Sequence, residues 1–277
     1  MITLIVDSTV CMTRKEANDL NVKIAPVTYY VQGQVYHEIY SDCNGDYIRL
    51  LNSNSGKCKT SQTNVSTFLS AFEEEIRKGN QVLCLTLSSR LSGTYSSASI
   101  AARELRSPNI VVVDSLLTAG GLFLLVKETA KLINQGLSLN EIVAILERTR
   151  NNIMIAFSVD DIMPLRRSGR LGIVRQSVGT ILNIKPLLLC VEGSVVSDGS
   201  ARGRNEQINK LTEKIPASAD TVIIHYISDM TTAKKVEAEI KKNNPSVNTS
   251  LKVLGPVLGV HLGTSLIGVV WMKENKN

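Results

Sequence analysis

The chain has 277 residues, of which 43% are hydrophobic but only 4% aromatic, and its formal net charge is +6. This length suits two domains of ordinary size, and the composition predicts a core of aliphatic side chains. Five scattered cysteines form no CxxC pair, which argues against a disulfide framework and a metal site. The apolar start ends at Asp7 and no run approaches the roughly 18 apolar residues of a membrane span, so we expect a cytoplasmic protein.

Short apolar runs alternate with helical patterns in the first half of the chain. Strands are expected at 2–8, 23–31, 81–88 and 109–115, and helices at 14–20, 64–78, 93–106, 117–135 and 139–151. This alternation predicts a mainly parallel sheet with flanking helices. The polar residues at 7–9, 88–89 and 114–115 follow three of the strands, so they should lie along one edge of the sheet.

The second half has a different pattern. Strands are expected at 153–159, 185–196, 221–227, 251–257 and 265–271, and helices at about 161–168, 173–182, 202–215 and 230–243. Segment 185–196 should form a hairpin that turns at Glu192 and Gly193. We therefore predict an α/β protein with an N-terminal domain over 1–151, and a C-terminal α/β domain with antiparallel pairing over 152–277.

The stretch SSRLSGTYSSA, at 88–98, carries more hydroxyl groups than the single cap that a helix needs. The expected helix begins at Gly93 and Thr94, where free N–H groups and the positive end of the helix dipole favour an anion. Nearby hydroxyl groups could complete the shell around a carboxylate, namely those of Ser92, Thr60 and Ser61. The alternative is an over-capped helix whose serines face water.

Histidine and arginine residues add further candidates. His261 lies in GPVLGVHLG, expected as a glycine-flanked loop between two apolar strands, where an imidazole could donate a hydrogen bond to a carboxylate. His225, in a strand, and His37, in a polar loop, are expected to be structural. The arginines of RRSGR, at 166–170, together with Arg202 and Arg204, suit carboxylates or phosphates; the alternative is a solvated helix end.

Several common motifs are missing from the sequence. It has no GxxxxGK[ST], no GxGxxG after a strand, no GxSxG and no HExxH, so ATP, NAD, lipase-like and zinc-hydrolase functions lack support. The motifs that remain are TSQ (60–62), SSRLSGTY (88–95), LRRSGRLG (165–172), NIKPLL (183–188), ARGR (201–204) and GPVLGVHLG (255–263). In this order and spacing they resemble the DegV family of bacterial fatty-acid-binding proteins.

The resemblance implies two α/β domains with one long-chain fatty acid buried in an apolar tunnel between them. It implies a carrier without catalytic residues, metal or cofactor, which presents the fatty acid carboxylate to a fatty acid kinase for conversion to acyl phosphate in phospholipid synthesis. The expected carboxylate-binding residues are Thr60, Ser61, Ser92, Gly93, Thr94 and His261. Arg170 and Arg202 match arginines of the region that meets the kinase, although Arg170 could instead support the carboxylate site. Segment 118–126 is a candidate for the tunnel wall or an ordinary core helix.

Two other functions compete with this interpretation. One is a serine-nucleophile lipid hydrolase, with Ser92 as nucleophile, His261 as base and Asp7 or Asp114 as the orienting acid. The other is a nucleic-acid-binding regulator, for which the positive net charge is the main argument. We expect no nucleic acid partner and no integral membrane segment, with at most transient membrane contact.

Overall fold

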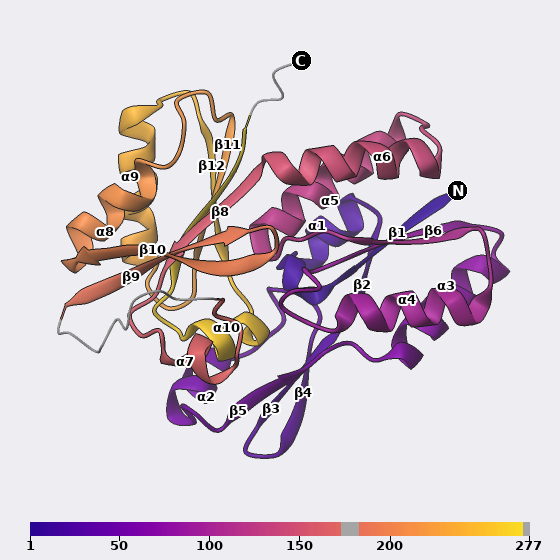
Figure 1. The fold of residues 1–277 in the computed structure, drawn as a ribbon, viewed down its shortest axis with the longest axis horizontal. Helices are drawn as coiled ribbons and strands as arrows, with labels where there is room; N and C mark the ends of the chain where they lie inside the picture. The colour runs from indigo at the N-terminus through magenta and orange to yellow at the C-terminus, as the bar shows by residue number, and fades with distance from the viewer. Residues whose placement is uncertain (173–182, 274–277) are drawn as a thin grey trace.

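The structure, a computed structural model, describes residues 1–172 and 183–273. Within these two ranges, no helix has the length and apolar character that crossing a membrane requires. Figure 1 shows two main sheets, with helices on their outer faces and between them. The fold class is the predicted α/β class, with one parallel sheet and two largely antiparallel sheets.

The first sheet, sheet A, is parallel and has the strand order β2-β1-β6-β7. Its strands are β1 (Ile2–Asp7), β2 (Val22–Ala25), β6 (Gln81–Thr86) and β7 (Ile110–Asp114). The helices of this half are η1 (Ser8–Val10), α1 (Arg14–Asp19), α3 (Val65–Arg77), α4 (Thr94–Leu105), α5 (Ala119–Asn134) and α6 (Leu139–Thr149). Because β1, β6 and β7 are parallel neighbours, their polar C-terminal ends share one edge, as predicted.

The strand expected at 23–31 is wrong in one respect, because Pro26 divides it between two sheets. Proline has no N–H group to donate to a ladder, and after it β3 (Val27–Val31) pairs antiparallel with β4 (Gln34–Glu38) and β5 (Cys58–Ser61). This three-stranded sheet, sheet B, and helix α2 (Tyr47–Ser53) were not predicted. His37 consequently lies on β4 rather than in a loop.

The third sheet, sheet C, has the order β10-β9-β8-β13-β11-β12, and its neighbours are antiparallel except β11 and β12. Its strands are β8 (Ile153–Ser158), β9 (Ile184–Val191), β10 (Ser194–Arg202), β11 (Thr221–Tyr226), β12 (Asn248–Val253) and β13 (Ile267–Met272). The helices are η2 (Arg150–Asn152), α7 (Met163–Arg167), α8 (Gly203–Thr212), α9 (Met230–Asn243) and α10 (Pro256–Leu262). The predicted hairpin is confirmed; the helix expected at 173–182 lies outside the described residues.

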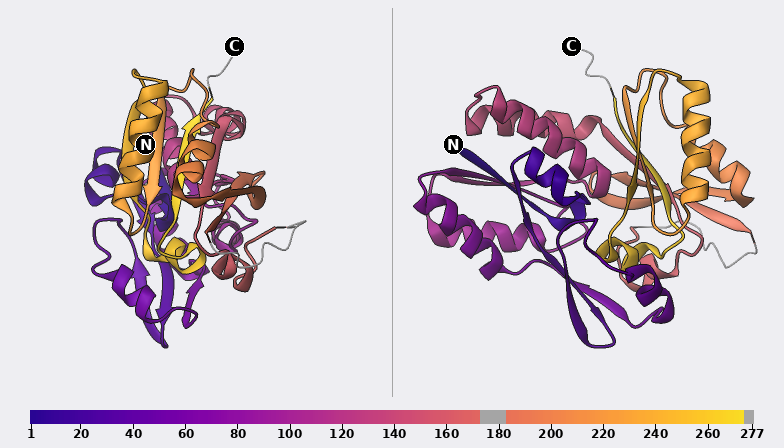
Figure 2. Two further views of the ribbon diagram at one scale, coloured as in Figure 1. Left: turned by 90° about the vertical axis from the view of Figure 1, so that its left-hand side faces the viewer. Right: turned by 180° about the vertical axis from the view of Figure 1, so that it is seen from behind.

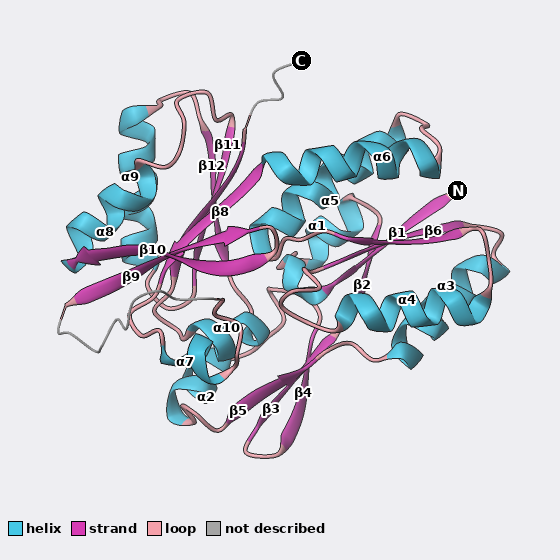
Figure 3. Cartoon of the chain, in the orientation of Figure 1, coloured by secondary structure: helices cyan, strands magenta, loops and turns pink. Residues whose placement is uncertain are grey.

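The two large sheets share a central core. Helices α3 and α4 cover the outer face of sheet A, α8 and α9 cover the outer face of sheet C, and α5 lies between the sheets (Figures 2 and 3). On β1, Leu4 and Val6 face the central core, whereas Ile5 faces α3 and α4. On β8, Phe157 faces the central core and Ala156 faces the outer helices. The central core therefore joins both halves, and the boundary at residues 151 and 152 stays a prediction.

Helix α5 lies very close to sheet C through two consecutive glycines. The Gly120 N–H donates to Nε2 of His225 at 2.8 Å, and a methyl group on Gly120 would lie 2.4 Å from that nitrogen. A methyl group on Gly121 would lie 2.7 Å from Cδ1 of Ile155. Since His225 Nε2 accepts, its Nδ1 donates to the Lys252 carbonyl at 3.1 Å. His225 therefore links α5 to β12 through two backbone hydrogen bonds, and it also lies in the wall of a cavity.

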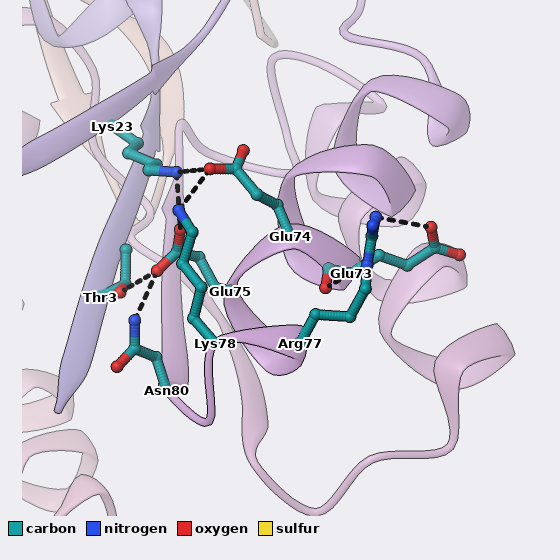
Figure 4. Close-up of polar contacts among 8 residues, drawn as sticks. All are labelled: Thr3, Lys23, Glu73, Glu74, Glu75, Arg77, Lys78 and Asn80. Carbon is teal, nitrogen blue, oxygen red and sulfur yellow. Dashed lines mark hydrogen bonds and ion pairs between the residues drawn. The ribbon is translucent and has the colours of Figure 1, made fainter.

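A buried carboxylate fastens α3 to sheet A (Figure 4). Glu75 is 3% exposed, and it accepts hydrogen bonds from Thr3, Lys23, Lys78 and Asn80. Burial alone would raise the pKa of Glu75, but these four donors outweigh it and hold the pKa well below its usual range. The carboxylate therefore stays charged and joins α3 to β1 and β2.

Candidate functional site

A cavity of about 120 Å³ lies between the edge of sheet A, sheet B, helix α10 and the inner face of sheet C. Most of its wall is apolar and comes from both halves of the chain, namely Leu87, Leu91, Ile155, Phe157, Leu165, Val195, Leu254, Val257, Leu258, Leu262, Leu266 and Val270. Segment 118–126 contributes Thr118 and Ala119 to the wall, while Leu122 and the residues after it pack into the central core. The cavity is suited to an apolar ligand.

Polar side chains gather in one part of the cavity wall. The structure brings together six of the predicted residues there, namely Thr60, Ser61, Ser92, Gly93, Arg170 and His261. Thr94 is fully buried outside the wall, with its hydroxyl group 3.0 Å from that of Ser92. Arg202 is exposed at the N-terminus of α8, away from the wall. The predicted set is therefore assembled apart from these two residues.

His261 lies on the short helix α10, so the expected loop between two strands is wrong. Pro256 occupies the first helical turn, which proline favours, and the apolar residues after it continue the helix. Nε2 of His261 lies 2.7 Å from Oγ1 of Thr60. Its Nδ1 is buried and has no hydrogen-bond partner within residues 1–172 and 183–273. One ring nitrogen is therefore held by the protein and the other is unused.

Burial and the nearby Arg170 charge lower the pKa of His261 to about 4. The imidazole is consequently neutral near pH 7 in the protein described here. Arg170 also contacts the segment that leads into α4. Its Nε donates a hydrogen bond to the carbonyl of Leu91, the residue before Ser92, at 3.2 Å. A ligand that carries negative charge would counter the effect of this guanidinium on the imidazole.

Ser92 lies at the N-terminal end of α4. Its Oγ accepts a hydrogen bond from the Thr94 N–H at 3.3 Å, and Gly93, as the N-cap residue, supplies no side-chain cap. The Ser92 hydroxyl group thus caps the N-terminal end of α4 and also lies in the cavity wall. A carboxylate at this point would be close to the positive end of the helix dipole.

Gln62, the last residue of TSQ, was not predicted as a site residue. Its Nε2 donates to Oγ of Ser97 at 2.8 Å, and a methyl group on Gly93 would lie 2.0 Å from its Oε1. The φ angle of Gly93 is an ordinary −76°, so the glycine is needed for this close approach. Gln62 thus occupies the space that a side chain at position 93 would need.

Glu38 on β4 was also not predicted as a site residue. It positions α10, the helix that carries His261. It is 1% exposed, and its Oε2 accepts from the Val257 N–H at 2.8 Å, at the start of α10. A methyl group on Gly255 would lie 2.3 Å from the carboxylate. Burial, with the nearby Asp7, raises the pKa of Glu38 to about 8. Sheet B therefore holds α10 twice, through Glu38 and Thr60.

Replacing Glu38 by glutamine should remove a pH dependence of stability. The folded pKa of about 8 exceeds the ordinary value of 4.5, so the folded state binds this proton more tightly than the unfolded state. Its contribution is complete below about pH 4.5 and is lost as the pH rises through about 8. Since one pKa unit corresponds to about 1.4 kcal/mol, the wild-type free energy of unfolding should fall by a few kcal/mol over this window.

Urea unfolding at several pH values measures this effect. Glu38→Gln should flatten the fall, whereas the control Glu104→Gln, at an exposed position on α4, should keep it. Equal slopes in the wild type and Glu38→Gln would contradict the assignment.

The hydrogen bonds do not form the Ser–His–Asp arrangement that a serine-nucleophile hydrolase requires. His261 is bonded to Thr60 rather than to Ser92. Asp7 accepts from the Thr9 hydroxyl group and two backbone N–H groups, and Asp114 accepts from two backbone N–H groups. In the described part of the chain, no hydrogen bond links His261 to Ser92 or to a carboxylate.

Comparison with known proteins shows which protein family has this architecture. Residues 1–274 match the profile of the DegV family of uncharacterised proteins. The chain belongs to the DegV family. A DegV domain-containing protein of Streptococcus pyogenes serotype M3 is 32% identical over 281 residues, which cover 99% of this DegV chain and 98% of the relative. One from Halalkalibacterium halodurans is 30% identical and covers 99% of both chains.

Solved DegV structures share the whole fold. The DegV protein of Thermus thermophilus, described as binding fatty acid, superimposes with a TM-score of 0.88 at 27% identity, over 99% of both chains. A DegV lipid-binding protein of Thermotoga maritima gives a TM-score of 0.88 at 24% identity, also over 99% of both chains. The second comparison shows the fold, and both show that this DegV chain has the two-domain architecture of the family.

Proposed function

We propose that this DegV protein is a carrier that binds one long-chain fatty acid, with the alkyl chain in the cavity and the carboxylate beside Thr60, Ser92 and His261. The observation that carries the proposal is an aliphatic cavity whose polar part contains a buried, unused imidazole nitrogen. A buried carboxylate needs several donors. In its protonated form His261 donates to the carboxylate through Nδ1 and to Thr60 through Nε2, which leaves the hydroxyl groups of Thr60 and Ser92 to donate to the carboxylate as well. The fatty-acid-binding DegV protein of Thermus thermophilus supports the same ligand class.

A long alkyl chain requires the cavity to widen. The cavity measures about 120 Å³, whereas an engineered cavity of roughly 150 Å³ holds a single benzene ring. The aliphatic side chains of the wall must therefore move apart when the chain enters. Burial of each CH₂ group contributes about 0.8 kcal/mol, so a long chain offsets the cost of parting them.

Mass spectrometry tests the ligand class directly. The purified protein should release fatty acid on denaturation, at about one molecule per chain, and the delipidated protein should bind palmitate again. A protein that releases no fatty acid and binds none after delipidation would show that the proposal is wrong.

We propose further that the bound carboxylate is presented to a fatty acid kinase, which converts it to an acyl phosphate. The sequence has no phosphate-binding loop motif, so phosphorylation needs a second protein. Arg170 lies in the cavity wall beside the polar residues, and Arg202 is exposed at the start of α8. Acidic groups on a kinase would complement these two arginines and guide its approach.

Arg202→Glu should lower kinase-dependent acyl phosphate formation by about tenfold or more, because reversing the charge repels the acidic surface of the partner. Fatty acid should remain bound, since Arg202 lies outside the cavity wall. The measurement is phosphorylation by a bacterial fatty acid kinase, with lipid occupancy followed by mass spectrometry. Arg77→Glu, at an exposed position on α3, serves as the control. Full activity in an Arg170→Ala/Arg202→Ala double variant would exclude the docking role.

A further inference from the structure

A polar side chain in the wall of the apolar cavity has no part in the proposed carboxylate site. Thr118 lies in this wall, at the N-terminus of α5. Figure 1 shows α5 beside β8, whereas α10, which carries His261, lies beside α2 and α7. The first turn of α5 contacts sheet C, because the Gly120 N–H donates to His225. Thr118 therefore belongs to a different part of the wall from Thr60 and His261.

The hydroxyl oxygen of Thr118 is buried, and it has no hydrogen-bond partner among the residues that the structure describes. Thr118 is the N-cap residue of α5, where a hydroxyl group ordinarily accepts from an N–H of the first turn. Those N–H groups are engaged elsewhere, since Gly120 donates to Nε2 of His225 at 2.8 Å and Gly121 donates to the Thr118 carbonyl at 3.0 Å. The helix that Thr118 begins therefore does not use its hydroxyl group.

The backbone on both sides of Thr118 is strained. Leu116 has a φ angle of 54° and Ala119 one of 49°, in the left-handed region that is unfavourable for residues other than glycine. Such strain persists only where the surrounding structure holds it, and here the Ser88 N–H donates to the Leu117 carbonyl at 2.8 Å. The segment from β7 to α5 is therefore held in place together with the Thr118 side chain.

An unpaired hydroxyl group in an aliphatic wall is unfavourable, because it has lost its hydrogen bonds to water without gaining others. Valine has the shape of threonine without the hydroxyl group, so it would suit such a wall better. An unsubstituted alkyl chain carries no oxygen or nitrogen atom that could bond to Thr118. The hydroxyl group of Thr118 therefore corresponds to no part of an unsubstituted fatty acid.

We propose that the cavity accepts a hydroxylated fatty acid, whose alkyl chain carries a hydroxyl group that bonds to Thr118. The inference rests on the proposed function, since the carboxylate of the same molecule lies beside Thr60, Ser92 and His261. The side chains of the wall must already move apart to admit an alkyl chain, and this movement opens a path to Oγ1 of Thr118. The two hydroxyl groups can each donate or accept, so each satisfies the other inside an apolar wall.

Displacement of a fluorescent fatty acid tests this assignment. The probes are 10-hydroxystearate and 12-hydroxystearate, compared with stearate, and 16-hydroxypalmitate, compared with palmitate. Thr118→Val should lower the affinity for at least one hydroxylated acid about tenfold, and it should leave the affinity for the parent acid unchanged or higher. Thr118→Ser, which keeps a hydroxyl group, should restore most of the loss.

Thr129→Val is the matched control on the same helix. The Thr129 hydroxyl group donates to the Leu125 carbonyl at 2.7 Å, and Thr129 lies outside the cavity wall. The control should change neither the affinity for a hydroxylated acid nor the affinity for its parent. The wild type alone gives a second measurement, because it should bind at least one hydroxylated acid about as tightly as the parent, whereas burial of an unpaired hydroxyl group would weaken binding by about tenfold or more.

The outcomes separate this inference from the proposed function. Equal changes for the hydroxylated acids and their parents in Thr118→Val, or no change for any of them, would overturn the hydroxyl assignment while the carrier function stands. Wild-type binding of all three hydroxylated acids that is at least about tenfold weaker than that of their parents would overturn it as well. A wild-type protein that binds neither the parent acids nor the hydroxylated acids would overturn both proposals.

Discussion

Replacing Ser92 by alanine should weaken fatty acid binding about ten- to a hundredfold. A hydrogen bond to a charged group is worth roughly 1.5–3 kcal/mol, and the Ser92 hydroxyl group lies in the cavity wall at the mouth of α4. Thr60→Ala should act in the same direction, because Thr60 also holds the His261 ring. Ser61, which lies in the same wall, limits the loss in that variant. Displacement of a fluorescent fatty acid measures each affinity.

The control for Ser92→Ala is the same substitution at Ser96, an exposed position on α4. Ser92→Ala also removes the hydrogen bond to the Thr94 N–H, which should cost about 1 kcal/mol of stability. Thermal melts of the delipidated proteins separate this loss from the loss of affinity. Wild-type affinity in both single variants and in a Thr60→Ala/Ser92→Ala double variant would refute the carboxylate assignment.

Fatty acid affinity should rise as the pH falls, and His261 should be the cause. Burial and the nearby Arg170 charge lower its pKa to about 4. A bound carboxylate favours the imidazolium form and raises this pKa. Binding then takes up a proton between the two pKa values, so affinity increases by up to about tenfold per pH unit in that window. Above the raised pKa the affinity should become independent of pH.

His261→Gln should abolish this pH dependence, because glutamine retains a hydrogen-bond donor but does not titrate. His37→Ala should leave it unchanged, since His37 lies on β4 and bonds to Thr28. An NMR titration provides the direct measurement. An identical His261 pKa with and without fatty acid would show that the carboxylate and the ring do not interact.

Much of the large-scale fold could be predicted from the sequence. Apolar strands such as 2–8 and 81–88 are buried on both faces, so their continuous hydrophobic runs are easy to recognise. Their polar ends fall on one sheet edge because parallel neighbours end together. Ser92 and Gly93, which the structure places in the cavity wall, could be chosen as candidates because a surplus of hydroxyl groups at a helix start is visible in the local sequence. The sequence therefore predicts best what depends on local pattern.

Features that depend on distant contacts could not be predicted. Strands β4 and β5 are short and partly exposed, so neither carries a strong alternating pattern. Glu38 accepts a hydrogen bond from the N–H of Val257, a residue 219 positions away. No local sequence pattern predicts a partner at that distance along the chain. Helix α10 was mistaken for a loop because its flanking glycines resemble turn residues. The sequence consequently located His261 but not the sheet that positions it.

The cavity wall drawn from both halves has a consequence for the lifetime of the protein. An alkyl chain bound in the cavity would be buried between the two halves of the protein, so it would bind the folded state and not the unfolded state. A ligand at a thousand times its dissociation constant stabilises the folded state by about 4 kcal/mol. Degradation that depends on transient unfolding slows accordingly. Molecules of the proposed carrier without lipid would be destroyed first, so its abundance would follow the supply of the lipid that it transports.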